Sequence, residues 1–237
     1  MCGRYRLGRG REAFKKYFGT AEREDFEWEP RYNIAPTQNV PVIRQDAKEP
    51  KRILSLMRWG LIPRWAADMS LGSKLINARS ETVTEKPSFV ACLRERRCLV
   101  PADGFYEWKR GGRSKQPYAF AMSDDSVFGF AGIWDRWRSA SGEIVESYSI
   151  LTTTPNAVTA DVHDRMPVIL PREHYDLWLD PGFKDVASLG ELLRPYNASA
   201  MKKFPVSARV NDVANDDAQC GEAIELNEVS VQGGLFG

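Results

Sequence analysis

The sequence has few metal-binding or crosslinking side chains, with four cysteines and two histidines among 237 residues. Four cysteines are too few for a disulfide scaffold in a chain of this length. Their spacing matches no zinc-binding pattern, and two histidines add few alternative ligands. We therefore expect no bound metal and no other cofactor.

The sequence also lacks the segments that carry proteins into or across membranes. No apolar run reaches the roughly 18 residues that suggest a membrane-spanning helix. The first residues, 1–5, lack the apolar core of a secretory signal. We therefore expect a cytoplasmic protein with no membrane partner. The net charge of +1 excludes a polycation, so any binding to nucleic acid must come from a local groove.

Hydrophobic periodicity predicts more strands than helices. The predicted strands are residues 40–43, 53–59, 98–100, 105–109, 118–122, 127–134 and 148–153, with a Gly111–Gly112 turn between two of them. The predicted helices are residues 11–18, a segment after Pro87 capped by Ser88, residues 173–179 and residues 189–194. Strands that do not alternate regularly with helices indicate an α+β fold with a curled, largely antiparallel sheet. No repeat or linker divides the chain.

Cys2 is the first candidate for chemistry. Removal of Met1, usual before a small residue, gives Cys2 a free α-amine next to its thiol. The reference pKa values, about 7.7–8.0 for the amine and about 8.5 for the thiol, leave both groups partly nucleophilic at neutral pH. The pair can attack an aldehyde and close a thiazolidine ring, or Cys2 can act as an N-terminal hydrolase nucleophile. We expect an exposed terminal side chain; the alternative is a buried, inert cysteine.

Glu107 is a candidate general acid–base. By strand alternation it shares a face with Phe105, opposite Tyr106 and Trp108. A carboxylate among apolar and aromatic neighbours is expected to have a raised pKa, as proton transfer near neutral pH requires. The alternative is a charge on an edge strand that faces solvent.

His163 lies in a segment that Pro167 keeps out of helical geometry at Met166. A loop histidine between Asp161 and Asp164 suits proton transfer near neutral pH. The alternative is a surface residue without a role.

Asn77, Arg79 and Glu81 point the same way if their segment is extended. An amide beside a guanidinium suits an anionic ligand that carries hydroxyl groups, such as a sugar phosphate. The alternative is a turn held by local side-chain hydrogen bonds.

Two Arg–Trp pairs, Arg58–Trp59 and Arg64–Trp65, lie six residues apart. Aromatic faces that stack on bases, beside arginines that bind phosphates, are typical of single-stranded nucleic-acid sites. Packing in the core is the alternative for Trp59 and Trp65.

Seven motifs, taken together and in this order, resemble the SRAP (SOS response-associated peptidase) family. They are MCGRY at 1–5, YNIAPT at 32–37, WGLIP at 59–63, NARSET at 77–82, RCLVPADGFYEW at 97–108, AGIW at 131–134 and HDRMPVIL at 163–170. The resemblance covers about residues 1–226, which we take as the domain; residues 227–237 are expected to form a disordered tail. It implies a single α+β domain with a barrel-like sheet. Separately, we expect the protein to be a monomer.

The resemblance also implies a function. It points to a sensor of abasic sites in single-stranded DNA that crosslinks itself to the lesion through a thiazolidine, a lyase-like chemistry that shields the strand from cleavage. Bound to damaged DNA, such a protein lies at the nucleoid. Two other functions stay open: a cysteine peptidase, or one that processes only its own Met1–Cys2 bond, and a non-catalytic module that binds single-stranded DNA.

Site residues follow from the matching positions. Cys2 is implied as the nucleophile, with Asn77, Glu107 and His163 completing the active site. DNA contacts are implied for Arg4, Trp65, Arg79 and Arg165, and the Arg–Trp pattern adds Trp59. We assign Glu107 to protonating the departing hydroxyl, His163 to opening the sugar ring and Asn77 to orienting the Cys2 amine.

Overall fold

Five strands close into a small barrel in the computed structural model, which describes residues 2–20, 28–46, 48–111 and 114–226. In order around the barrel they are β10 (Ile144–Thr153), β4 (Arg52–Trp59), β3 (Asn39–Gln45), β6 (Arg97–Ala102) and β9 (Phe128–Arg138). Pairing of β9 with β10 closes the ring. Within the barrel β10 and β4 run parallel, and the other neighbours are antiparallel.

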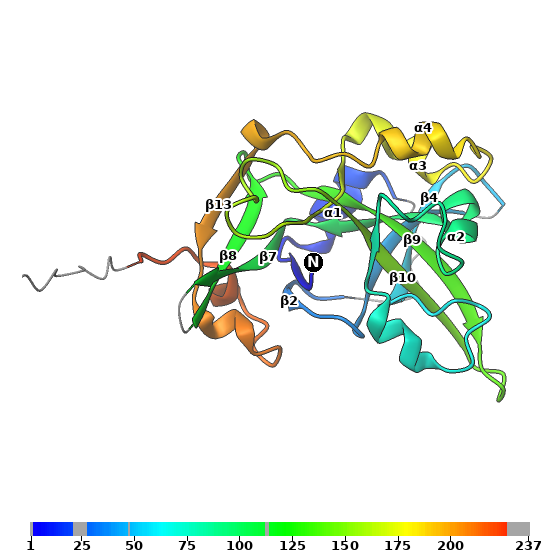
Figure 1. Cartoon of the computed structure of the whole chain (residues 1–237), viewed down its shortest axis with the longest axis horizontal. Helices are drawn as coiled ribbons and strands as arrows, with labels where there is room; N and C mark the ends of the chain where they lie inside the picture. The colour runs from blue at the N-terminus through cyan, green and yellow to red at the C-terminus, as the bar shows by residue number, and fades with distance from the viewer. Residues whose placement is uncertain (1, 21–27, 47, 112–113, 227–237) are drawn as a thin grey trace, which may run out of the picture.

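A second, antiparallel sheet lies beside the barrel. Its strands are, in order, β13 (Met201–Pro205), β8 (Ser114–Met122), β7 (Gly104–Gly111), β1 (Arg4–Leu7) and β2 (Arg31–Ile34). In Figure 1, β7 and β8 lie to the left of the crossing strands β9 and β10, and β1, in blue, starts near the centre. The chain passes from the barrel to this sheet between β6 and β7, at Asp103.

The remaining elements are short. The strands are β5 (Asn77–Arg79), β11 (Met166–Pro167) and β12 (Ile169–Leu170); the α-helices are α1 (Arg11–Phe18), α2 (Val90–Glu95), α3 (Tyr175–Leu179) and α4 (Val186–Glu191). The 3-10 turns are Met69–Lys74, Arg172–His174, Ala198–Ala200, Ala208–Asn211 and Ala218–Gly221. Among the described residues, no helix is long and apolar enough to cross a membrane.

This architecture confirms the predicted α+β fold with a curled, barrel-like and mostly antiparallel sheet. All seven predicted strands overlap observed ones, and the first helix has the predicted bounds. The cap at Ser88 was wrong, since Phe89 precedes α2 and no side chain caps it. The last helix begins earlier than predicted because Asp185 accepts hydrogen bonds from the N–H groups of Ala187 and Ser188. The predicted turn at Gly112 and the tail at 227–237 lie outside the described residues.

Aromatic side chains fill the space between the barrel and the second sheet. Tyr5, on β1, makes edge contacts with Trp59 at 5.2 Å and with Phe130 at 5.9 Å between ring centroids. Its hydroxyl lies 2.8 Å from the hydroxyl of Tyr148 on β10, and both rings are fully buried. The pair is satisfied because each hydroxyl is the other's partner. The core thus fastens β1, the strand next to Cys2, to the barrel.

The turn after β4 depends on two glycines whose backbones touch. Gly60 has a φ of +116°, and a Cβ there would lie 2.5 Å from the carbonyl oxygen of Gly72. A Cβ on Gly72 would lie 2.7 Å from the carbonyl oxygen of Gly60. Backbone atoms cannot rotate away as a side chain can, so neither position accommodates a larger residue.

We expect Gly60→Ala to lower the free energy of unfolding by about 2–4 kcal/mol, from the strained φ and the overpacked contact. Urea unfolding measures this change. Gly10→Ala is the matched control, because a Cβ at Gly10 meets nothing within 4 Å and its φ is −62°. Equal stability of the two variants would contradict the close backbone contact.

Candidate active site

Pairing of β1 with β7 brings the N-terminus beside Glu107. Arg4 lies opposite Tyr106 and Tyr5 opposite Phe105 in this antiparallel pair. The residues before Arg4 therefore run alongside those after Tyr106. Cys2 is fully buried, with its Sγ 3.9 Å from the carbonyl oxygen of Arg4.

Burial corrects the expectation that Cys2 has an exposed side chain. Its thiol belongs to the main hydrophobic cluster. Desolvation, and secondly the negative charge of Glu107, raise the pKa of the Cys2 thiol well above its usual range. The thiol is therefore protonated at neutral pH and needs a base before its sulfur can attack.

Glu107 has the environment that the strand pattern predicts. Phe105 packs in the main cluster and stacks on Phe120, whereas Tyr106 and Trp108 pack in a second cluster on the other face of β7. Glu107 is 4% exposed, which excludes the solvent-facing alternative. Desolvation raises the pKa of its carboxyl to about 7, as predicted.

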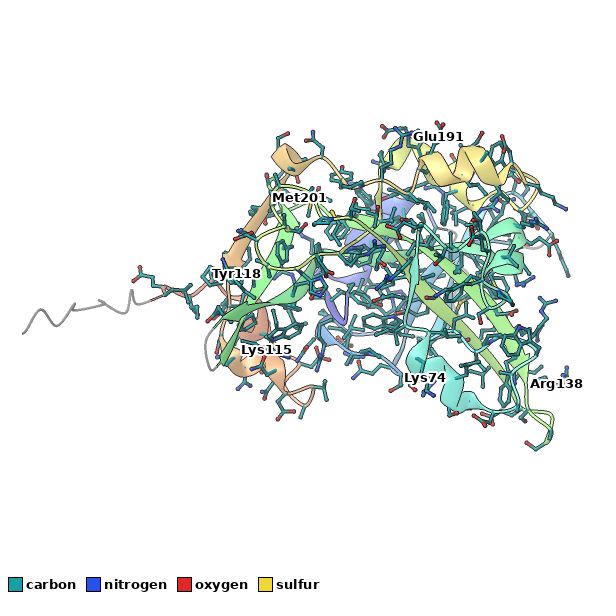
Figure 2. All side chains as sticks on the ribbon, viewed as in Figure 1. Lys74, Lys115, Tyr118, Arg138, Glu191 and Met201 are labelled. Atoms are coloured by element: carbon teal, nitrogen blue, oxygen red, sulfur yellow. The ribbon has the colours of Figure 1, made fainter. Side chains whose placement is uncertain are left out.

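A cavity of about 300 Å³ opens beside this carboxyl. It is lined by Arg4, Glu107, Trp108, Lys115, His163 and Asn211. Three residues predicted from the sequence, Arg4, Glu107 and His163, therefore meet here from segments far apart in the chain. The other three were missed. Lys115, at the lower end of β8 in Figure 2, ends a cluster of basic residues between 109 and 115, which is the signal that could have indicated it, whereas Asn211 belongs to no motif.

Trp108, the third missed residue, could have been found, since it ends the motif that contains Glu107. Its Nε1 donates to Oδ1 of Asn211 at 2.7 Å, which fixes the plane of the indole. The Arg4 guanidinium lies 5.8 Å from the centre of the ring, in a cation–π contact. Nε of Arg4 is buried without a hydrogen-bond partner among the described residues.

His163 lies in the loop before β11, as predicted. Its Nδ1 accepts a hydrogen bond from the backbone N–H of Arg165 at 3.0 Å. The same Nδ1 lies 2.9 Å from Oδ1 of Asp164, a contact that forms a bond only when Nδ1 carries a proton. We give priority to the backbone donor, because the side chain of Asp164 is 89% exposed and hydrated. The neutral ring then carries its proton on Nε2.

Asn77 and Arg79 lie on β5, which pairs with the end of β10. The Nδ2 of Asn77 donates to the carbonyl of Ile76 at 3.0 Å, and its Oδ1 is buried without a partner among the described residues. Arg79 is exposed. The extended segment ends there, because the N–H of Thr82 bonds back to the Arg79 carbonyl. Glu81 therefore sits in a turn rather than on the strand with Asn77 and Arg79.

The two tryptophans predicted to stack on DNA have opposite environments. Trp59 is fully buried and its Nε1 donates to the carbonyl of Ile76 at 2.9 Å. The prediction that Trp59 offers a stacking face is therefore wrong, because the ring packs on Tyr5 and Tyr148 in the core. Trp65 is 59% exposed and keeps a free face.

Arg165 is mostly buried rather than free on the surface. Its side chain is 11% exposed and its guanidinium pairs with the carboxylate of Glu81. Arg79 is therefore the more accessible of the two arginines near β5. No group of three or more His, Cys, Asp or Glu side chains with metal-binding geometry occurs among the described residues.

Comparison with known proteins gives close matches along most of the chain. The family model described as SOS response associated peptidase (SRAP) matches residues 1–213. The abasic site processing protein YoaM of Bacillus subtilis is 41% identical over 228 residues, covering 94% of this chain and 98% of YoaM. The abasic site processing protein HMCES of Mus musculus is 34% identical over 268 residues, covering 93% of this chain and 75% of HMCES.

Solved structures share the fold. A protein from Bacteroides thetaiotaomicron has a TM-score of 0.84 at 27% identity, covering 94% of this chain and all of its own. A protein from Bordetella bronchiseptica has a TM-score of 0.74 at 29% identity, covering 87% of this chain and all of its own.

The raised pKa of Glu107 makes stability depend on pH. The carboxyl holds its proton to about pH 7 in the folded state and to about 4.5 when exposed, so between these values the folded state binds more protons. Stability therefore falls as pH rises through this window. Relative to Glu107→Gln, the wild-type free energy of unfolding is expected to drop by about 3 kcal/mol between pH 4 and pH 8.

Urea unfolding across that pH range measures the difference. Glu143→Gln, at an exposed carboxyl in the turn between β9 and β10, is the control and is expected to track the wild type. A Glu107→Gln curve parallel to the wild-type curve would show that Glu107 titrates normally.

Proposed function

This chain belongs to the SOS response associated peptidase (SRAP) family, and we propose that it processes abasic sites in DNA through a covalent link to Cys2. The observation that carries the proposal is the buried carboxyl of Glu107, with a pKa of about 7, beside the Cys2 thiol. A thiol that burial keeps protonated needs a neighbour that can both give and take a proton near neutral pH. Glu107 fits that requirement.

The reaction forms one thiazolidine and one water. Once Met1 is removed, the Cys2 amine attacks the C1′ aldehyde of the ring-opened deoxyribose, and loss of water from the adduct gives an imine. The Cys2 sulfur then adds to the imine carbon, its proton passes to a base, and the imine nitrogen gains a proton. No atom changes its net oxidation state overall, so no oxidant or reductant is needed. Closing the ring removes the imine that would otherwise promote strand cleavage.

Glu107 serves both proton transfers at Cys2. Its protonated carboxyl gives a proton to the departing hydroxyl, and the resulting carboxylate takes the proton of the thiol. A pKa of about 7 keeps both forms populated at neutral pH.

His163 opens the sugar ring. With Nδ1 held by the N–H of Arg165, the proton on Nε2 can pass to the ring oxygen as the bond from that oxygen to C1′ breaks. The C1′ hydroxyl gives its proton back to Nε2, so the imidazole ends neutral and the aldehyde is left.

The remaining predicted residues suit binding of the strand. Asn77 Oδ1 and Arg4 Nε, both buried without partners among the described residues, are available to the Cys2 amine and to a phosphate respectively. Trp65 offers a stacking face, and Arg79 an exposed charge. A face that stacks on bases, together with a charge that contacts phosphates, is typical of sites that bind single-stranded DNA.

We expect Cys2→Ala to abolish the crosslink to a single-stranded oligonucleotide that carries an abasic site, as measured by a band that survives a denaturing gel. Cys2→Ala and Cys2→Ser both keep the α-amine, so an imine still forms but hydrolyses; borohydride, which reduces the imine, should restore a band for either variant. Because the Cys2 side chain is buried, Cys2→Ala should also lower the free energy of unfolding, by about 1 kcal/mol.

Cys92→Ala is the control, because it also removes a buried thiol. A stable crosslink by Cys2→Ala without borohydride would make another residue the nucleophile. Cleavage of a peptide without any crosslink would favour a cysteine peptidase, and reversible binding without either reaction would favour a binding module. Intact mass of the protein tests the removal of Met1.

We expect Arg79→Ala to weaken binding to single-stranded DNA without regard to sequence, and to reduce the salt dependence by about one phosphate contact. Fluorescence anisotropy at several salt concentrations measures both quantities. Arg138→Ala is the matched control, because it removes an exposed charge at the end of β9. In Figure 2, Arg138 lies on the other side of the molecule from Lys115, which lines the cavity. Equal effects of the two substitutions, or duplex bound as tightly as single strands, would contradict this assignment.

A further inference from the structure

Glu81 and Arg165 form a two-pronged ion pair next to the end of β10. The Nη1 of Arg165 donates to Oε1 of Glu81 at 2.5 Å, and its Nη2 to Oε2 at 2.9 Å. The hydrogen bonds from Arg165 lower the pKa of the Glu81 carboxyl, so the pair is charged at neutral pH. Paired donors of this kind fix orientation as well as distance.

The same guanidinium also binds the main chain of β10. Its Nη2 donates to the carbonyl of Thr152 at 2.6 Å, and the N–H of Ser80 donates to the same carbonyl at 2.9 Å. Thr152 is buried and lies opposite Arg79 in the pairing of β5 with β10. The strand that carries Asn77 and the loop that carries His163 are therefore joined at one carbonyl group.

The backbone of Arg165 continues this chain of contacts to the active site. Its N–H is the donor that holds Nδ1 of His163. The route thus runs from the carboxylate of Glu81 to the Arg165 side chain, and from the Arg165 main chain to the imidazole. Glu81 itself does not line the cavity.

We propose that Glu81 is a positioning residue that acts through Arg165 to hold the His163 ring with its proton on Nε2. The kinetic effect of this inference rests on the proposed function. Which nitrogen of the His163 ring carries the proton can be observed without any reaction. Both terminal nitrogens of the Arg165 guanidinium are committed to Glu81 and Thr152, and its Nε is buried without a partner among the described residues. Glu81 and Thr152 therefore fix the position of the Arg165 side chain.

The first test separates the rate from the affinity. Glu81→Gln should lower the first-order rate of crosslink formation at saturating protein by about tenfold to a hundredfold, the scale expected when a reacting group is misplaced. Affinity for single-stranded DNA with a tetrahydrofuran abasic analogue, which has no aldehyde, should stay the same or rise, because a negative charge is lost. Glu81→Asp, which keeps the charge, should recover part of the rate.

Glu85→Gln is the matched control, at an exposed carboxyl in the same turn, and should behave as wild type. A wild-type rate for Glu81→Gln would overturn the proposal. So would a loss of affinity as large as the loss of rate, because Arg165 would then act mainly on DNA.

The second test does not depend on crosslinking. Nitrogen-15 NMR of the imidazoles reports which ring nitrogen carries the proton, and the chain has only two histidines to distinguish. Glu81→Gln and Arg165→Lys should both shift neutral His163 away from the Nε2–H form, with the His174 signals unchanged. An unchanged His163 spectrum in a folded variant would overturn the proposal. Absence of a crosslink by the wild-type protein would instead overturn the proposed function and leave this test standing.

Discussion

The arrangement of the site depends on one strand, β10, which changes partners along its length. Its first part pairs with β9 and, at Ser147 and Tyr148, with β4, so this part closes the barrel. Its last residues pair with β5 and β11 instead. The pairing of β10 with β4 ends before β10 does. The last residues of β10 therefore pair with β5, which carries Asn77, and with β11, which follows the loop of His163. The barrel therefore gives a rigid base to residues that the sequence keeps far apart.

The second constraint is the burial of Cys2 and Glu107, which removes both groups from solvent. Desolvation moves both pKa values in the same direction, so at neutral pH the thiol keeps its proton and the carboxyl is half ionised. In the proposed reaction the two groups therefore act as a pair, and the pKa of Glu107 sets the pH range over which they exchange a proton. The Tyr5–Tyr148 hydrogen bond joins β1, the strand next to Cys2, to β10 of the barrel.

Much of the fold could be predicted from local patterns, because strand alternation and turn residues act over a few positions. The face and raised pKa of Glu107 followed from its strand neighbours alone. Predictions failed where tertiary packing decided the outcome. Burial of Trp59 and Cys2 depends on how β1 and β4 meet, and Asn211 reaches the cavity from a segment without any motif. The Glu81–Arg165 pair joins positions 84 residues apart, beyond the reach of any periodicity.

The burial of Cys2 also bears on its survival in a cell under oxidative stress, a condition that also damages DNA. Peroxides oxidise the thiolate, and a thiol that is desolvated and beside a carboxylate has very little thiolate to offer. Burial therefore disfavours sulfenic acid formation at Cys2, whereas in the proposed reaction the sulfur attacks an imine that has formed next to it. Under the proposed function, the same burial that makes Cys2 depend on Glu107 for its deprotonation also keeps the thiol reduced until an aldehyde binds.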